Sequence, residues 1–243
     1  MFKIGIVGGI GSGKSTVTRR LQGLGCGVVD ADRIGHEVLD YPEVIDQIRA
    51  RWCIQENGTA GRPHSDAAVL LGPSGGKQSV SRPAVAELIF NSNNVDERKF
   101  LERVMHPLIE RKIHDSLSRY NDDYIPAVVV DAPLLYEAGW DSICAFIIFV
   151  QCARGTRFGR YCMRRGVTDA VDFKAREAAQ LPPEEKAKRA DQVIENDAEL
   201  DYLHRQVDWL WHNALRAKII EHKPVNHYVF WKLGLEAANA KSA

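Results

Sequence analysis

The segment Gly8-Gly9-Ile10-Gly11-Ser12-Gly13-Lys14-Ser15 constrains the fold of this chain more than any other feature. It matches the pattern G-x-x-x-x-G-K-[S/T], in which glycines allow consecutive backbone N–H groups to turn inward around phosphate oxygens. The apolar run Phe2 to Val7 precedes it and is typical of a buried strand, while Lys14 to Leu24 follows with apolar residues at helical spacing. A strand, a glycine-rich loop and a helix in this order predict an α/β fold with a phosphate-binding loop.

Each polar group of this loop has an expected task. The start of the helix adds unpaired N–H donors and a partial positive charge. The ammonium group of Lys14 is expected to reach the β- and γ-phosphates, the hydroxyl of Ser15 to bind Mg²⁺, and Thr16 to donate to the α-phosphate. The alternative is a glycine-rich turn whose lysine is merely solvated. The expected ATP-binding residues of the loop are Gly11, Ser12, Gly13, Lys14, Ser15 and Thr16.

Four more strands are predicted along the chain, with helical patterns between them: Val28-Val29, Ala127 to Val130, Ala145 to Val150 and Gln192 to Ile194. Strands that alternate with helices form parallel sheets covered by helices on both faces. We therefore expect an α/β fold of the three-layer P-loop NTPase type, with a parallel sheet of about five strands.

Two connections are longer than a single crossover helix requires. Helical patterns at Arg82 to Phe90 and Asp96 to Tyr120 predict a helical lobe over about 33–125. The strongly charged helical segment Ala153 to Arg189 predicts a lid over about 153–189. We expect both to belong to one domain that spans 1–222.

Two stretches differ in composition from the rest. Asn57 to Ser79 contains five glycines and two prolines, which favours a flexible surface insertion. Lys223 to Ala243 is expected to be a C-terminal extension. Its aromatic residues Tyr228, Phe230 and Trp231 suggest that it packs on the body of the protein, but the segment indicates no chemistry.

Composition bounds the possible partners and the compartment. Lys plus Arg and Asp plus Glu number 32 each, so no overall field favours nucleic acid or anionic lipid. The five cysteines are scattered, which indicates reduced thiols rather than a disulfide framework or a zinc site. The longest apolar stretch, Ile143 to Val150, is too short to span a bilayer. We expect a cytoplasmic protein without a secretory leader, either a monomer or a small homo-oligomer.

The second predicted strand ends in Asp30-Ala31-Asp32. Ligands of open α/β sheets bind at the carboxyl ends of the strands, so a carboxylate there would lie beside the γ-phosphate. In that place Asp32 could align an acceptor hydroxyl and take its proton. Asp32 could equally be the N-cap of a helix from Arg33 to Leu39. The spacing alone leaves the two roles open.

The loop followed by Val29-Asp30-Ala31-Asp32 resembles the opening of the dephospho-CoA kinase family, and further motifs follow in family order. These are Ser81-Arg82 leading to Ile89-Phe90, His106-Pro107-Leu108-Ile109, Pro133-Leu134-Leu135-Tyr136-Glu137, and Ala190-Asp191-Gln192-Val193-Ile194-Glu195-Asn196. The resemblance covers roughly Phe2 to Trp209. It implies ATP- and Mg²⁺-dependent phosphorylation of the ribose 3′-hydroxyl of dephospho-CoA, which gives CoA and ADP.

The resemblance also assigns roles by position. It implies that Asp32 is the base for the acceptor hydroxyl, that Lys14 is catalytic, and that Arg160 is the lid arginine that acts in transfer. Arg164 lies one helical turn after Arg160 and is expected to share its face, at the phosphates of ATP. The alternative is that Arg157, Arg160, Arg164 and Arg165 form a solvated basic face.

Weaker assignments concern the metal and the acceptor. Asp131 ends the third strand in the place of a Walker-B carboxylate and is a candidate Mg²⁺ ligand; a plain aspartate facing water is the alternative. His106 falls in the lobe that resembles the CoA-binding region, where a structural histidine is the alternative. Arg82 and Gln180 are further candidate contacts to substrate or nucleotide.

The chain departs from the family pattern in three places. Thr59 to Gly76 is longer than the usual connection, the tail after Lys223 is additional, and Arg51-Trp52-Cys53 replaces an aromatic-glycine pair. These departures leave the limits of the acceptor pocket open. A related kinase with another small acceptor is one rival hypothesis. A nucleotide switch is a second, but Asn93-Asn94 and Asn196-Asp197 do not fit the guanine-reading pattern N-K-x-D.

Overall fold

The computed structural model describes residues 1–52, 71–74, 77–90, 94–120, 124–166 and 170–222. Its centre is a five-stranded sheet in the order β2-β5-β1-β6-β7, in which every neighbouring pair is parallel. The predicted five-stranded parallel sheet is therefore confirmed. The strands are β1 (Phe2–Val7), β2 (Gly27–Asp30), β5 (Ala127–Asp131), β6 (Phe146–Gln151) and β7 (Gln192–Glu195).

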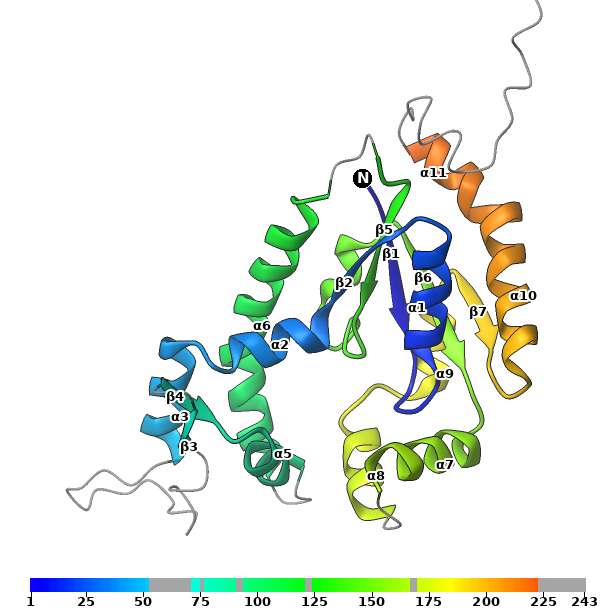
Figure 1. Cartoon of the computed structure of the whole chain (residues 1–243). Helices are drawn as coiled ribbons and strands as arrows, with labels where there is room; N and C mark the ends of the chain where they lie inside the picture. Colours follow the sequence, from blue (N-terminus) through cyan, green and yellow to red (C-terminus); the bar gives the residue numbers. More distant parts are fainter. Residues whose placement is uncertain (53–70, 75–76, 91–93, 121–123, 167–169, 223–243) are drawn as a thin grey trace, which may run out of the picture.

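Helices cover the sheet on both faces, which makes three layers (Figure 1). One face is covered by α1 (Lys14–Gly23), α10 (Leu200–Leu210), a π-helical turn (Trp211–Leu215) and α11 (Arg216–His222). The other face is covered by α2 (Ala31–Val38) and α6 (Val95–Leu117). In β5, Val128 and Val130 pack into one core and Ala127 and Val129 into the other, so this strand is apolar on both faces up to Asp131 at its end.

A lobe projects from the sheet on the α6 side (Figure 1). It contains α3 (Pro42–Trp52), α5 (Arg82–Phe90) and an antiparallel hairpin of β3 (Leu71–Ser74) and β4 (Lys77–Val80). The hairpin shows that the last part of the predicted surface insertion, Asn57 to Ser79, has regular backbone pairing, from Leu71 opposite Val80 to Ser74 opposite Lys77. Residues 53–70 of that prediction, and the extension 223–243, lie outside the described residues.

The predicted charged arm consists of three helices. They are α7 (Arg154–Arg165), α8 (Ala170–Ala178) and α9 (Pro183–Arg189), and a short 3-10 helix (Trp140–Ile143) precedes β6. Gly166 ends α7 with a φ of 66°, a conformation that glycine adopts without strain. Figure 1 shows α7 and α8 beside the loop that joins β1 to α1, at the carboxyl ends of the strands. No helix in the described part of the chain is long and apolar enough to cross a membrane.

Candidate active site

The glycine-rich loop has the backbone that its sequence predicts. Gly11 and Gly13 have φ angles of 75° and 91°, and a Cβ on Gly13 would lie 2.0 Å from Nδ2 of Asn196. A side chain at Gly13 is thus excluded for both conformational and steric reasons. Lys14 opens α1, and its Nζ donates to the carbonyl oxygens of Gly8 at 3.1 Å and Gly9 at 3.5 Å. Lys14 therefore links the end of the loop to its first two residues by hydrogen bonds.

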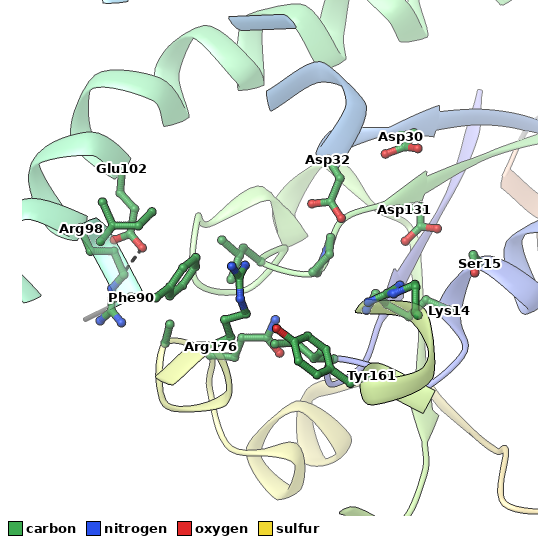
Figure 2. Close-up of a pocket in the computed structure, with 18 of the residues that line it drawn as sticks. Lys14, Ser15, Asp30, Asp32, Phe90, Arg98, Glu102, Asp131, Tyr161 and Arg176 are labelled. Carbon is green, nitrogen blue, oxygen red and sulfur yellow. Dashed lines mark ion pairs between the residues drawn. The ribbon is translucent and has the colours of Figure 1, made fainter. Parts of the chain in front are cut away.

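The loop forms one end of a cavity of about 590 Å³ between the sheet, the lobe and the lid helices. Figure 2 shows Lys14, Asp32 and Asp131 at one end and Phe90, Arg98 and Glu102 at the other. Of the predicted site residues, the cavity is lined by Gly11, Gly13, Lys14, Ser15, Asp32, His106, Asp131, Arg160, Arg164 and Gln180. Ser12, Thr16 and Arg82 are not among the lining residues. Arg82 is exposed and forms an ion pair with Asp40 at 3.7 Å.

Three carboxylates lie at the carboxyl ends of β2 and β5. Asp30 and Asp131 are directly opposite each other in the sheet register, and Asp32 lies in the first turn of α2. The N-cap of α2 is Asp30, whose Oδ1 accepts a hydrogen bond of 2.9 Å from the backbone N–H of Arg33. The alternative prediction of Asp32 as the N-cap is therefore wrong. The helix-capping role falls to Asp30, and the carboxylate of Asp32 faces the cavity.

The carboxyl group of Asp32 is accessible to water, but nearby protein atoms still raise its pKa. Its side chain is exposed because the cavity is open, yet protein atoms surround it closely, and burial raises the pKa of its carboxyl group above 3.8. Lys14 opposes this shift, and the negative charge of Asp30 adds to it. Because the side chain is accessible to solvent, water limits the size of this shift in pKa. A carboxylate of raised pKa in a cleft is suited to accepting a proton.

The charges of Asp131 and Lys14 each shift the pKa of the other group. Burial raises the pKa of Asp131, while Lys14 and a 2.9 Å hydrogen bond from Oγ1 of Thr18 lower it. Burial also lowers the pKa of Lys14, against the charges of Asp131 and Asp32. The attraction between these groups favours their charged forms.

The donor set fits Mg²⁺ in its usual setting with nucleotides. Magnesium prefers oxygen ligands and is commonly held by one or two side chains together with substrate phosphates and water. Ser15 and Asp131 both line the cavity beside Lys14. Within the described ranges there is no group of three or more His, Cys, Asp or Glu side chains that could hold a metal alone. Phosphate oxygens would therefore have to complete the ligand shell.

The lid arginines have different environments, so they do not form one solvated face. Arg160 donates from Nη2 to the backbone oxygen of Asn196 at 3.0 Å and from Nη1 to Sγ of Cys152 at 3.4 Å. Arg164 and Arg165 are exposed at the cavity. Arg157 is buried and does not line the cavity. The alternative prediction of a solvated basic face is thus wrong for Arg157, which is 4% exposed.

Asn196 is a structural partner of the loop that sequence reasoning did not single out. Its side chain is buried and donates from Nδ2 to the carbonyl oxygen of Ser12 at 2.6 Å. Its own carbonyl oxygen accepts from Arg160. Asn196 thus joins the loop after β7 to both the phosphate loop and the lid. The only signal in the sequence was its place at the end of the motif Ala190 to Asn196.

The far end of the cavity combines apolar side chains with the ion pair of Arg98 and Glu102, 3.6 Å apart. Ile89 and Phe90 of α5 and Leu101, Met105 and Ile109 of α6 line it. The guanidinium group of Arg176, from α8, lies 4.3 Å from the centre of the Phe90 ring, so the lid and the lobe meet here. His106 also lines this region. The centre of its ring lies 5.4 Å from the centre of the Trp140 ring, and burial lowers the pKa of His106. A neutral histidine in an aromatic contact is compatible with either of its predicted roles.

The last helix of the lid region is anchored by a buried ion pair. Nζ of Lys186, on α9, lies 2.8 Å from both Oε1 of Glu137 and the carbonyl oxygen of Pro133. The same carboxylate oxygen accepts from the backbone N–H of Leu181 at 2.7 Å. This ion pair fixes α9 to the turn that follows Asp131. The lid region is therefore held to the sheet at its C-terminal end.

Comparisons with known proteins agree with this geometry. A sequence model of the family described as dephospho-CoA kinase matches residues 2–202. A dephospho-CoA kinase from Synechococcus sp. (strain CC9902) is 35% identical over 208 residues, 86% of this chain and 94% of that protein. The crystal structure of TT1252 from Thermus thermophilus is 31% identical, with a TM-score of 0.65 over 88% of this chain and 97% of that one. A dephospho-CoA kinase from Campylobacter jejuni, 23% identical, has the same fold, with a TM-score of 0.60 over 89% and 98% of the two chains.

The parallel sheet, the phosphate loop with its lysine, and the cleft between a lobe and a lid define a P-loop kinase. Within this class, the chain belongs to the dephospho-CoA kinase family. Its function is that of the family, the final step of coenzyme A biosynthesis.

Proposed function

We propose that the chain transfers the γ-phosphoryl group of ATP to the 3′-hydroxyl of the dephospho-CoA ribose, with Asp32 as the base. The phosphate loop and Lys14 hold the triphosphate, and the carboxylate of Asp32 orients the hydroxyl and takes its proton. Arg160 donates to the phosphoryl oxygens as charge spreads over them. The observation that carries the proposal is the presence of Asp32, Lys14 and Arg160 on the wall of one cavity.

Ser15 and Asp131 would hold Mg²⁺ beside the loop, directly or through water. A bound magnesium ion would neutralise charge on the β- and γ-phosphate oxygens. Lys14 and Ser15 would contribute from the first turn of α1, and Asp131 from the end of β5. We keep Thr16 and Arg164 as proposed nucleotide contacts, although only Arg164 lines the cavity.

The acceptor would lie between the lobe, about 33–125, and the lid, about 153–189. The apolar wall at Phe90 and Leu101 would suit the apolar parts of dephospho-CoA. His106 on this wall remains a proposed acceptor contact, as does Arg82, which lies outside the cavity lining. Closure of α7 and α8 over both substrates would exclude water and limit hydrolysis of ATP. We further propose a single domain over 1–222, a cytoplasmic location, and a monomer or small homo-oligomer.

The acceptor is tested by comparing ADP release with different alcohols. We expect dephospho-CoA to stimulate ADP release from ATP with Mg²⁺ well above the rate with nucleoside monophosphates. Analysis of the product should place the new phosphate on the 3′-oxygen. Stimulation by a nucleoside monophosphate but not by dephospho-CoA would contradict the proposed acceptor and favour a related kinase.

The pH dependence of kcat/KM tests the role of Asp32 as base. Because Asp32 acts in its ionised form, activity should fall as the pH decreases through its pKa, which lies above 3.8. Asp30→Asn removes a negative charge that raises this pKa, and asparagine also caps helices. The acidic limb of the profile should therefore move to lower pH in this variant. A limb that stays in place, or moves to higher pH, would count against Asp32 as the titrating group.

A further inference from the structure

The residue that follows β7 contacts the phosphate loop with its side chain. Nδ2 of Asn196 donates to the carbonyl oxygen of Ser12 at 2.6 Å, and Asn196 is only 6% exposed. Gly13 lines the substrate cavity, whereas Asn196 does not. The amide group of Asn196 therefore holds the Ser12 carbonyl from the outer side of the loop.

This hydrogen bond also fixes the next N–H group of the loop. The peptide bond between Ser12 and Gly13 is trans and planar, so its C=O and N–H groups point in opposite directions. Because the Ser12 carbonyl points outward to Asn196, the N–H of Gly13 points to the side of the loop that lines the cavity. Inward N–H groups are the donors with which such a loop binds phosphate. Asn196 thus holds one phosphate donor in place.

The same residue holds the lid arginine. The backbone oxygen of Asn196 accepts from Nη2 of Arg160 at 3.0 Å. The backbone N–H of Asn196 donates at 2.8 Å to the carbonyl oxygen of Gln151, the last residue of β6, so this acceptor is fixed to the sheet. The next residue, Asp197, accepts from the backbone N–H of Ala153 at 2.8 and 2.9 Å, just before the helix that carries Arg160. The segment after β7 therefore sets where the guanidinium group lies.

We propose that Asn196 is a positioning residue for phosphoryl transfer, which holds the N–H of Gly13 and the guanidinium group of Arg160 in register around the transferred group. Its side chain fixes the loop and its backbone oxygen fixes the arginine, so one residue sets the spacing between the two donors. Asn196 itself touches no substrate. The inference rests on the proposed function, in which the loop binds ATP and Arg160 acts in transfer.

The test measures single-turnover transfer to dephospho-CoA and calorimetric binding of a non-hydrolysable ATP analogue with Mg²⁺. Asn196→Ala removes the side-chain donor and leaves the backbone oxygen. We expect the transfer rate to fall about 10²-fold, the loss typical of a group misplaced by about 1 Å, and the affinity for the analogue to fall only about fivefold. Added to Arg160→Met, the same substitution should lower the rate less than about tenfold further, because the arginine that it positions is absent.

Gln206→Ala is the matched control. The side chain of Gln206 pairs with the backbone N–H and oxygen of Glu195, so its loss loosens the same end of β7 without touching the phosphate loop. This variant should keep the wild-type transfer rate. A loss as large as that of Asn196→Ala would refute the proposal, since loosening of β7 would then explain both results.

Two further outcomes would overturn the proposal. One is a wild-type transfer rate in Asn196→Ala, even with a lowered thermal midpoint, which would leave Asn196 a structural role. The other is a pair of losses that multiply in the double variant, because Asn196 would then act independently of Arg160. If Asn196→Ala does not fold, Asn196→Asp keeps the shape and replaces the donor by an acceptor, and full activity in it would have the same meaning. A full transfer rate in Arg160→Met alone would instead contradict the proposed function.

Discussion

Asp32→Asn is expected to lower kcat by about 10³-fold while leaving the affinity for ATP nearly unchanged. The carboxylate faces the cavity near Lys14 and does not cap α2, since that role belongs to Asp30. Asparagine has almost the same shape as aspartate but cannot accept the proton of the acceptor hydroxyl. The loss should therefore appear in the chemical step rather than in folding or nucleotide binding.

The measurement combines single-turnover transfer to dephospho-CoA with calorimetric binding of ATP and Mg²⁺. Asp30→Asn serves as the control, because it changes the neighbouring carboxylate and preserves the N-cap. This control should retain most of the transfer rate at neutral pH. Full turnover by Asp32→Asn would remove Asp32 from the mechanism. A large loss of ATP affinity in that variant would point to a role in holding the nucleotide instead.

The central fold was predictable because its signals are local. Each strand of the sheet is a short apolar run, and β5 is apolar on every residue from Ala127 to Val130 because both of its faces are buried. The glycine-rich loop requires positive φ angles that its glycines provide, so the sequence also located the turn from β1 to α1. These features depend on neighbours in the chain, which a single sequence displays.

The lobe and the lid were less predictable because their boundaries depend on distant contacts. Leu71 to Val80 lies in a segment rich in glycine and proline, yet its backbone pairs as a hairpin. The charged arm predicted over Ala153 to Arg189 is divided into three helices, and the last is anchored by Lys186 to Glu137, 49 positions earlier in the chain. Charge patterns indicate that helices are exposed, but they do not show which ion pair fixes each end.

In the site, too, residues set by local sequence were predicted and residues placed by distant contacts were not. The spacing of the loop placed Lys14 and Ser15 correctly on the cavity wall, and strand ends placed Asp32 and Asp131 there too. The sequence left the role of Asp32 open between base and N-cap, and it did not identify Asp30 as the cap, because both aspartates are residues that cap helices. The contact of Asn196 with the loop was not predicted, because it exists only after β7 has been placed beside the loop.

The second large effect is expected at Arg160. Arg160→Met should lower kcat by about 10³-fold, which is the lower range found for arginines that stabilise phosphoryl transfer, with a much smaller effect on ATP affinity. The guanidinium group lies near the phosphate loop, with Nη1 3.7 Å from a Cβ built on Gly13, and its Nη2 is held by the carbonyl oxygen of Asn196. Rigid donors beside the phosphates stabilise the charge that develops during transfer more than the charge of the ground state.

Because Arg160 also joins α7 to the loop after β7, its structural contribution must be separated from its catalytic one. Arg160→Lys keeps the charge but loses the planar fork, so it should recover only part of kcat if two aligned donors are needed. Arg154→Met, on the same helix and outside the cavity, should leave kcat unchanged. A fall in the thermal midpoint of Arg160→Met with unchanged kcat would mean that Arg160 only anchors the lid. A loss of ATP affinity with unchanged kcat would indicate that it binds the nucleotide equally in the ground state and the transition state.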